Sequence, residues 1–251
     1  MIILEWSIKS NIITGKMNID RNVECQDKTC YIQHDDFSCI ALADGASCAM
    51  YSGAGAEGVT TAVCQFMRER FDYLYELDEE KIKYEVLCAV LRHLRKIIIE
   101  KNIKLKDLGS TLLFTAIKGN KYISMLLGDG IIAKHNKESN GYSIYSESNI
   151  TGKKKHLTSS PMCYLHAHLN KGITDNTDIF FMCSDGLADN MNLNDEVLLK
   201  QSINTILEKD ILECIYKETT NNIIDAATDK QGGYIYTDDC SYVALYINGN
   251  R

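Results

Sequence analysis

The sequence has only one proline, Pro161, among its 251 residues, and no low-complexity tract, internal repeat or polar linker. Because domain boundaries usually fall in exposed segments rich in proline, glycine or polar residues, we expect a single domain over residues 1–251. No apolar run approaches the roughly 18 residues of a membrane span, so we expect no membrane segment.

An excess of basic residues is missing as well. The 27 lysines and arginines are outnumbered by 34 aspartates and glutamates, which gives a formal charge of −7. Nucleic-acid-binding domains normally carry a basic surface, so we expect no nucleic acid partner. The densest basic stretch, residues 153–156, is interpreted as a solvated turn.

Ten cysteines are present, but no two of them form a Cys-x-x-Cys pair, so a zinc knuckle or a dithiol redox motif is not indicated. Cys39, Cys64, Cys88 and Cys183 lie in apolar runs, where cysteine behaves as a small hydrophobic residue. The first residues also lack the pattern of a secretory signal. We therefore expect a cytoplasmic protein with reduced thiols.

Hydrophobic periodicity places strands in the middle of the chain and helices before and after them. Strands are expected at 2–13, 37–43, 111–117, 122–127, 131–135, 142–145, 162–168, 178–184 and 242–247. Helices are expected at 55–77, 78–102, 195–207 and 211–228. This grouping predicts an α+β layered fold rather than alternating βαβ units.

One alternative metal site involves His166 and His168. If they lay on a strand, alternation would put both rings on one face, as a zinc site requires. No further histidine or acidic partner stands at a recognisable spacing. A strand face with polar side chains is therefore the favoured interpretation.

Three aspartates share a local pattern in which an apolar strand leads to the aspartate and then to a turn. They are Asp44 before Gly45, Asp129 between two glycines, and Asp185 before Gly186. A fourth element, Asp238-Asp239, precedes the last strand instead. A single Asp-Gly is more often a structural turn. Several carboxylates at the ends of packed strands would repel one another, and hard divalent cations, which prefer oxygen ligands, relieve that repulsion.

The order of these motifs resembles that of the PPM (PP2C-type) phosphatases, in particular their compact bacterial branch, over about residues 20–247. Further matching pieces are Cys25-Gln26-Asp27, Gly53-Ala54-Gly55-Ala56, Gly109-Ser110-Thr111 and Asp238-Asp239-Cys240-Ser241. The resemblance implies a four-layer α-β-β-α sandwich with two central antiparallel sheets flanked by helix pairs. It also implies hydrolysis of phosphoserine and phosphothreonine in proteins, opposite a serine/threonine kinase, by a hydroxide that bridges two divalent cations, Mn²⁺ or Mg²⁺.

The same resemblance implies roles for individual residues. Asp44, Asp185 and Asp238 are the expected catalytic metal ligands, and Asp44 bridges the two cations. Gly45 binds through its backbone carbonyl, and Asp27 acts through metal-bound water. Asp129 matches a position that helps to hold a third, weaker cation in some members. Asp239 is the neighbour of the expected ligand Asp238, and a shift of one residue in the match would exchange the two.

Two positions depart from the family pattern. Ala46 stands where many members carry a histidine, a candidate proton donor to the leaving group, so the donor is unassigned. Asn22 stands near the place of a phosphate-binding arginine, and its neighbour Arg21 is a candidate phosphate ligand. Two other functions stay open: a PPM-like fold kept as a regulatory or binding module, and a phosphatase of small phosphorylated metabolites. We expect a monomer.

Overall fold

Two five-stranded antiparallel sheets form the centre of the protein, in a computed structural model that describes residues 6–136, 142–146, 156–175, 177–189, 191, 196–209 and 238–247. One sheet has the order β1-β10-β9-β6-β7, and the other has the order β2-β3-β4-β5-β8. Their strands are β1 (Trp6–Ile13), β2 (Lys28–His34), β3 (Phe37–Ala43), β4 (Leu112–Lys118), β5 (Lys121–Leu127), β6 (Ile131–Asn136), β7 (Tyr142–Ser146), β8 (His168–Ile173), β9 (Asp178–Cys183) and β10 (Cys240–Ile247).

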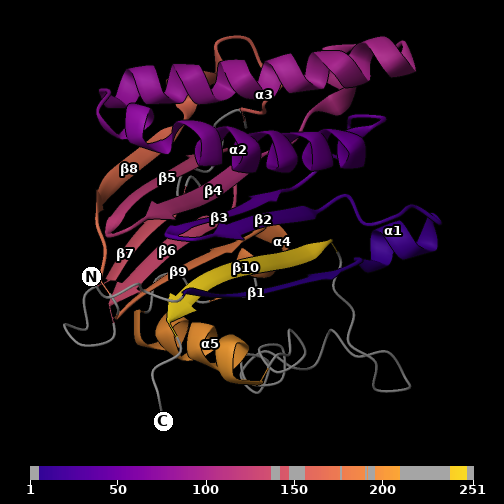
Figure 1. Cartoon of the computed structure of the whole chain (residues 1–251). Coiled ribbons are helices and arrows are strands. Elements are labelled where there is room, and N and C mark those ends of the chain that lie inside the picture. Colours follow the sequence, from indigo (N-terminus) through magenta and orange to yellow (C-terminus); the bar gives the residue numbers. More distant parts are fainter. Residues whose placement is uncertain are drawn as a thin grey trace, which may run out of the picture.

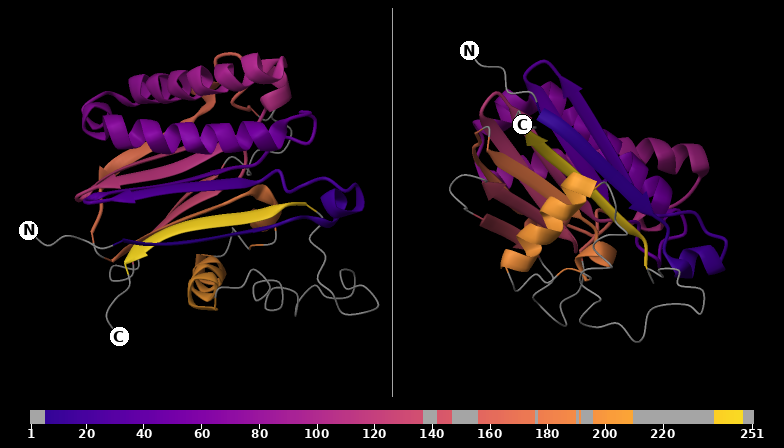
Figure 2. Two further views of the ribbon diagram at one scale, coloured as in Figure 1. Left: turned by 45° about the vertical axis from the view of Figure 1, so that its right-hand side comes forward. Right: turned by 90° about the horizontal axis from the view of Figure 1, so that it is seen from below.

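Helices cover the outer faces of the two sheets, as Figures 1 and 2 show. The α-helices are α1 (Lys16–Asp20), α2 (Ser52–Tyr75), α3 (Glu79–Lys101), α4 (Asp185–Ala188) and α5 (Glu196–Lys209), and the 3₁₀ helices are η1 (Leu105–Leu108) and η2 (Cys163–His166). The pair α2 and α3 packs over the sheet that contains β3, and α5 packs over the sheet that contains β10. The predicted α+β class and its α-β-β-α layers are confirmed.

The alternation of side chains along each central strand builds the layers. In β3, Cys39, Ala41 and Ala43 face the helix pair, whereas Ile40 and Leu42 face the other sheet. In β9 the same alternation turns Phe180 and Met182 inward between the sheets. Because both faces are buried, these strands are apolar apart from Ser38 in β3 and Asp178 at the start of β9. A fully buried leucine, isoleucine, phenylalanine or methionine side chain contributes about 1.5–3 kcal/mol. The strand ends are thereby fixed, and the aspartates that follow them are fixed too.

The two long helices begin and end for local reasons. The Asp78 side chain caps α3 by accepting a hydrogen bond from the Lys81 N–H at 2.9 Å. Asn102 ends the helix in the left-handed conformation at φ 51°, which asparagine tolerates better than most residues. The start of α2 is rich in glycine because it lies against η1: a Cβ at Gly55 would lie 2.1 Å from the carbonyl oxygen of Leu108. Among the described helices, none is long and apolar enough to cross a membrane.

Most predicted elements are confirmed, but the strand expected at 162–168 is wrong. Residues 163–166 form the 3₁₀ helix η2, and the strand begins only at His168. Cys163 and Ala167 are buried four residues apart while Leu165 is exposed, which is the spacing of a helical turn. Helix α1 and the edge strand β2 were not predicted. The helix expected at 211–228 lies outside the described residues.

Candidate metal centre

Three of the predicted aspartates converge at one end of the two sheets. Asp44 follows β3, Asp129 lies in the turn from β5 to β6, and Asp185 is the first residue of α4. One carboxylate oxygen from each lies within 4.8 Å of the other two, and each residue is half-buried. Of all the His, Cys, Asp and Glu side chains in the described ranges, these form the one group of three with such spacing. The group draws on both sheets, so only the assembled sandwich creates it.

Asp27 lies directly beside this group and is fully buried. Its Oδ2 accepts a hydrogen bond from the Ser241 hydroxyl at 2.7 Å. Its Oδ1 is buried and receives no hydrogen bond from an N–H or hydroxyl group in the described part of the chain. Burial raises the pKa of Asp27 to about 6, against the hydrogen bonds from Ser241 and Ser184.

The charge on the group is costly without a counter-ion. Burial, together with the negative charges of Asp27 and Asp185, raises the pKa of Asp44 to about 10. Buried carboxylates that repel one another, with one oxygen that no donor from the described residues reaches, match the preferences of a hard divalent cation. The residues present therefore fit a bound divalent metal.

Hydrogen bonds fix Asp44 and Gly45 on their strand end. The Asp44 N–H donates to Thr111 Oγ1 at 2.8 Å, and the Thr111 N–H donates back to the Asp44 carbonyl at 2.9 Å. Gly45 pairs with Ser110 in an isolated bridge. A Cβ at Gly45 would lie 2.9 Å from the Cβ of Ser52 and 3.0 Å from the Gln26 carbonyl oxygen. This close packing leaves room only for glycine and holds the Gly45 backbone beside Asp44.

Asp129 is presented by a turn that requires its two glycines. Gly128 and Gly130 have φ values of 94° and 114°, a region that residues with a Cβ rarely adopt. A Cβ at Gly130 would also lie 2.7 Å from the carbonyl oxygen of Cys183, the last residue of β9. The turn therefore brings Asp129 close to the end of the strand that leads to Asp185.

The structure places Asp238 and Asp239 differently. Asp238 is exposed, and its Oδ1 accepts a hydrogen bond from the N–H of Asp239 at 2.9 Å. Asp239 is only 3% exposed, and both of its carboxylate oxygens are hydrogen-bonded. Its Oδ1 accepts from the Gly15 N–H at 2.7 Å, and its Oδ2 accepts from Asn18 Nδ2 at 2.9 Å and the Gln26 N–H at 2.7 Å. Asp239 thus ties α1 and the segment before Asp27 to β10. Neither residue belongs to the group of three.

Arg21 is exposed at the end of α1, on the segment that Asp239 ties down. Ala46 donates its N–H to the Gly109 carbonyl at 3.0 Å and has no group that could donate a proton to a substrate. His166 lies on η2 and its ring stacks on that of His156 at 3.4 Å, whereas His168 begins β8. In the described residues the two histidines belong to no group of three metal ligands.

Sequence reasoning did not assign roles to several side chains that support the site. Thr111 and Ser241 were noted only as parts of motifs, yet their hydroxyls bond Asp44 and Asp27. Ser184 accepts from the Ser241 N–H at 3.0 Å and links β9 to β10. A signal was present in the sequence, since each of these hydroxyl residues lies at a strand end.

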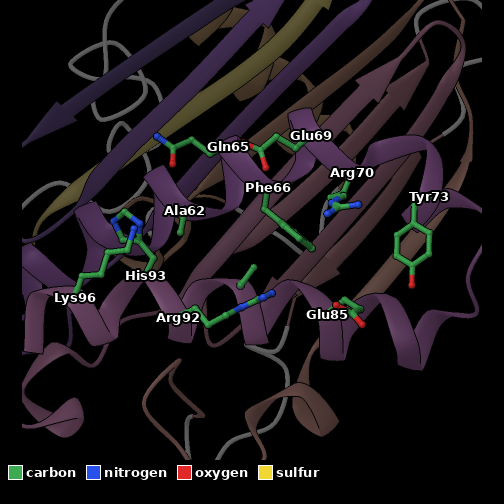
Figure 3. A pocket seen from close by; sticks show the side chains of 11 residues that line it. Ala62, Gln65, Phe66, Glu69, Arg70, Tyr73, Glu85, Arg92, His93 and Lys96 are labelled. Carbon is green, nitrogen blue, oxygen red and sulfur yellow. The ribbon is translucent and has the colours of Figure 1, made fainter.

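A cavity of about 490 Å³ lies elsewhere, between α2 and α3, as Figure 3 shows. Its lining mixes both charges, including Arg70 and Arg92 with Glu69 and Glu85. All of its lining residues belong to the two helices, whereas the three aspartates come from the ends of strands. The cavity is therefore separate from the candidate metal centre.

Comparisons with known proteins point to one family. The sequence matches the family model described as Protein phosphatase 2C over residues 14–215. A comparison with curated proteins finds no match. Among solved structures, the chain is similar to RsbX in complex with magnesium, at 16% identity over 99% of this chain and 100% of that chain, with a TM-score of 0.54.

Two further structures have the same fold. The serine/threonine phosphatase of S. agalactiae is 16% identical over 97% of this chain and 100% of that chain, with a TM-score of 0.60. The phosphatase domain of the cell fate determinant SpoIIE from Bacillus subtilis is 14% identical over 99% and 95% of the two chains, with a TM-score of 0.52. At these identities the likeness shows a shared fold.

Proposed function

The chain belongs to the protein phosphatase 2C family, and we propose that it is a metal-dependent phosphatase that hydrolyses phosphoserine and phosphothreonine in proteins. The observation that carries this proposal is the convergence of Asp44, Asp129 and Asp185 within 4.8 Å, beside the buried carboxylate of Asp27. Such a group has the oxygen ligands, the negative charge and the partial exposure that a catalytic cation site needs.

In this proposal Asp44, Asp185 and Asp238 hold the catalytic cations, Gly45 contributes its backbone carbonyl, and Asp27 acts through water. Bound there, two divalent cations would neutralise the carboxylates, polarise the phosphoryl group and supply a hydroxide at neutral pH. Mg²⁺ or Mn²⁺ suits an all-oxygen site, and one structure of similar fold, RsbX, is in complex with magnesium. Asp129 would hold a third, weaker cation.

The remaining side chains position this group. Asp239 has both oxygens engaged by Gly15, Asn18 and Gln26, which supports a positioning role over direct ligation. Because the same bonds hold the segment that carries Arg21, that guanidinium is the candidate contact for the substrate phosphate. Thr111 and Ser241 keep Asp44 and Asp27 in place. Ala46 leaves the protonation of the leaving group to a donor outside this set.

We further propose one domain over residues 1–251 that acts as a cytoplasmic monomer, opposite a serine/threonine kinase. The nine cysteines in the described ranges are free thiols, which supports a reducing compartment. The formal charge of −7 supports the expectation that nucleic acid is not a partner.

Hydrolysis assays test the proposal. With Mn²⁺, the protein should hydrolyse p-nitrophenyl phosphate and a phosphothreonine peptide, and a chelator should abolish both activities. Asp185→Asn should lower kcat about 100-fold or more, because the cation that stabilises the negative charge on the reacting phosphate would no longer be held in place. Asp36→Asn, in the turn at the far end of β2 and β3, is the matched control and should leave kcat unchanged.

One observation favours a second candidate function, a regulatory or binding module: Ala46 replaces a candidate proton donor. Complete inactivity of the folded, metal-loaded protein on both substrates would support that module and refute the enzyme. Turnover of phosphorylated metabolites at the expense of phosphopeptides would instead make the chain a phosphatase of small molecules.

A further inference from the structure

Large apolar side chains are exposed on two segments that border the candidate metal centre. On the segment that leads to Asp27, Met17 is 44% exposed, Ile19 is 62% exposed and Val23 is 39% exposed. On the loop that leaves Asp44, Met50 is 80% exposed and Tyr51 is 38% exposed. We call these five residues the apolar rim. Such side chains gain free energy when a partner covers them.

The two segments pack against each other next to the aspartates. A Cβ at Gly45 would meet the carbonyl oxygen of Gln26 at 3.0 Å, and a Cβ at Gly53 would lie 3.8 Å from the Gln26 Cα. Gln26 and Gly45 are the immediate neighbours of Asp27 and Asp44. Toward the right of Figure 1, α1 lies at the same end of the sheets as the start of β10, the strand that directly follows Asp238 and Asp239 in the sequence.

Hydrogen bonds hold both segments in place. Asn18, between Met17 and Ile19, donates to the Asp239 carboxylate at 2.9 Å, and the Gly15 N–H donates to the same carboxylate. The Tyr51 N–H donates to the Asp107 carbonyl at 2.8 Å. At the other end of the loop that leaves Asp44, the Ala46 N–H donates to the Gly109 carbonyl. A surface whose backbone is already ordered loses less conformational entropy on binding, so its contacts contribute more to affinity.

We propose that the apolar rim docks the polypeptide that carries the phosphorylated residue, through apolar side chains that flank the phosphoserine or phosphothreonine. This inference rests on the proposed function, because the phosphoryl group fixes the peptide at the aspartates and so brings its neighbouring residues over the rim. A small phosphorylated metabolite is polar and ends close to its phosphate, so it would leave the rim uncovered. The inference therefore selects an apolar phosphoprotein segment as the substrate.

Binding of two phosphonate peptides tests this docking without turnover. Both carry a non-hydrolysable analogue of phosphothreonine; one has leucines and isoleucines around it, and the other has serines. Fluorescence anisotropy with metal-loaded protein should show about tenfold tighter binding of the apolar peptide, which corresponds to about 1.4 kcal/mol. The double variant Ile19→Ser/Met50→Ser should reduce that preference to less than about twofold.

The control is Ile173→Ser, since Ile173 is 57% exposed and pairs with Lys121 at the end of the sheet away from Asp129. It should keep the full preference. The double variant should also keep the wild-type turnover of p-nitrophenyl phosphate, which is too small to reach the rim, and its melting temperature. Equal binding of the two peptides, binding of neither, or a preference that survives the double variant would overturn the inference. A preference without hydrolysis of any phosphate ester would instead refute the proposed function alone.

Discussion

Replacing Asp239 by asparagine should destabilise the protein far more than the same change at its neighbour Asp238. The buried Asp239 carboxylate accepts three hydrogen bonds, two of them from the backbone N–H groups of Gly15 and Gln26. An asparagine can keep its carbonyl oxygen at the Oδ2 position, where it retains the bonds from Asn18 and Gln26. Its NH₂ group then faces the Gly15 N–H, and two donors oppose each other in a buried site.

The magnitude follows from the lost interactions. One hydrogen bond to a charged group contributes about 1.5–3 kcal/mol, and an unsatisfied buried N–H adds a cost of about 1–3 kcal/mol. Removal of the Asp239 charge also removes a repulsion on the Asp27 carboxylate, which favours the variant. This gain is small, because burial raises the Asp27 pKa more than the Asp239 charge does. We therefore expect a net loss of about 3 kcal/mol for Asp239→Asn. Asp238 is exposed, so Asp238→Asn should change stability by less than about 0.5 kcal/mol.

Urea unfolding in the presence of a chelator measures both values without a contribution from bound metal. The two variants carry the same charge change at adjacent positions, so their difference isolates the buried hydrogen bonds. Equal effects of the two substitutions, or a loss below about 1 kcal/mol for Asp239→Asn, would mean that the buried hydrogen bonds of Asp239 do not stabilise the fold.

Two further predictions concern the same site. In Gly186→Ala the new Cβ would lie 2.1 Å from the Asp239 carbonyl oxygen, so we expect a loss of about 1–3 kcal/mol in urea unfolding. Gly53→Ala, whose Cβ would meet nothing closer than 3.8 Å, should be neutral or stabilising, and a costly Gly53→Ala would contradict the steric argument. The pKa values of Asp44 and Asp27 are raised from 3.8 to about 10 and about 6, so the folded state favours their neutral forms. Stability in chelator is then full below the unfolded pKa and is lost as pH rises toward the raised values. The melting temperature in chelator should therefore fall from about pH 4 to about pH 8, and saturating Mg²⁺ should remove most of that fall; a melting temperature in chelator that is flat or rises with pH would argue against the raised values.

The layers of the fold and the three aspartates that converge could be predicted from the sequence. Strands such as β3 and β9 are apolar on both faces, and an aspartate follows each within two residues, so the strands and these aspartates can be read from the local sequence. The site itself forms only where the two sheets meet. The edge strand β2 was missed because its exposed face carries Tyr31 and Gln33 and its burial is irregular. Helix α1 has no buried residue and so has no periodic pattern.

The roles of Asp238 and Asp239 depend on contacts across the chain and could not be read from two adjacent aspartates. The bonds from Gly15 and Asn18 to Asp239 span more than 220 residues. In the same way, the sequence indicated a strand at 162–168, whereas burial of Cys163 and Ala167 against the helix-pair core selected a helical turn. Tertiary packing decided both cases.

If the carboxylates around Asp44 bind divalent cations, Asp44→Asn should have opposite effects on the metal-free and the metal-bound protein. Burial and the neighbouring carboxylates raise the pKa of Asp44 to about 10, so the metal-free wild type must take up a proton there on folding. Asparagine is already neutral, so the metal-free variant should be as stable as the wild type or more stable. Loss of a ligand should remove most of the rise in melting temperature that Mn²⁺ produces in the wild type. We expect a variant that melts no lower than wild type in chelator and does not respond to Mn²⁺. A variant that Mn²⁺ stabilises as strongly as the wild type would contradict this expectation.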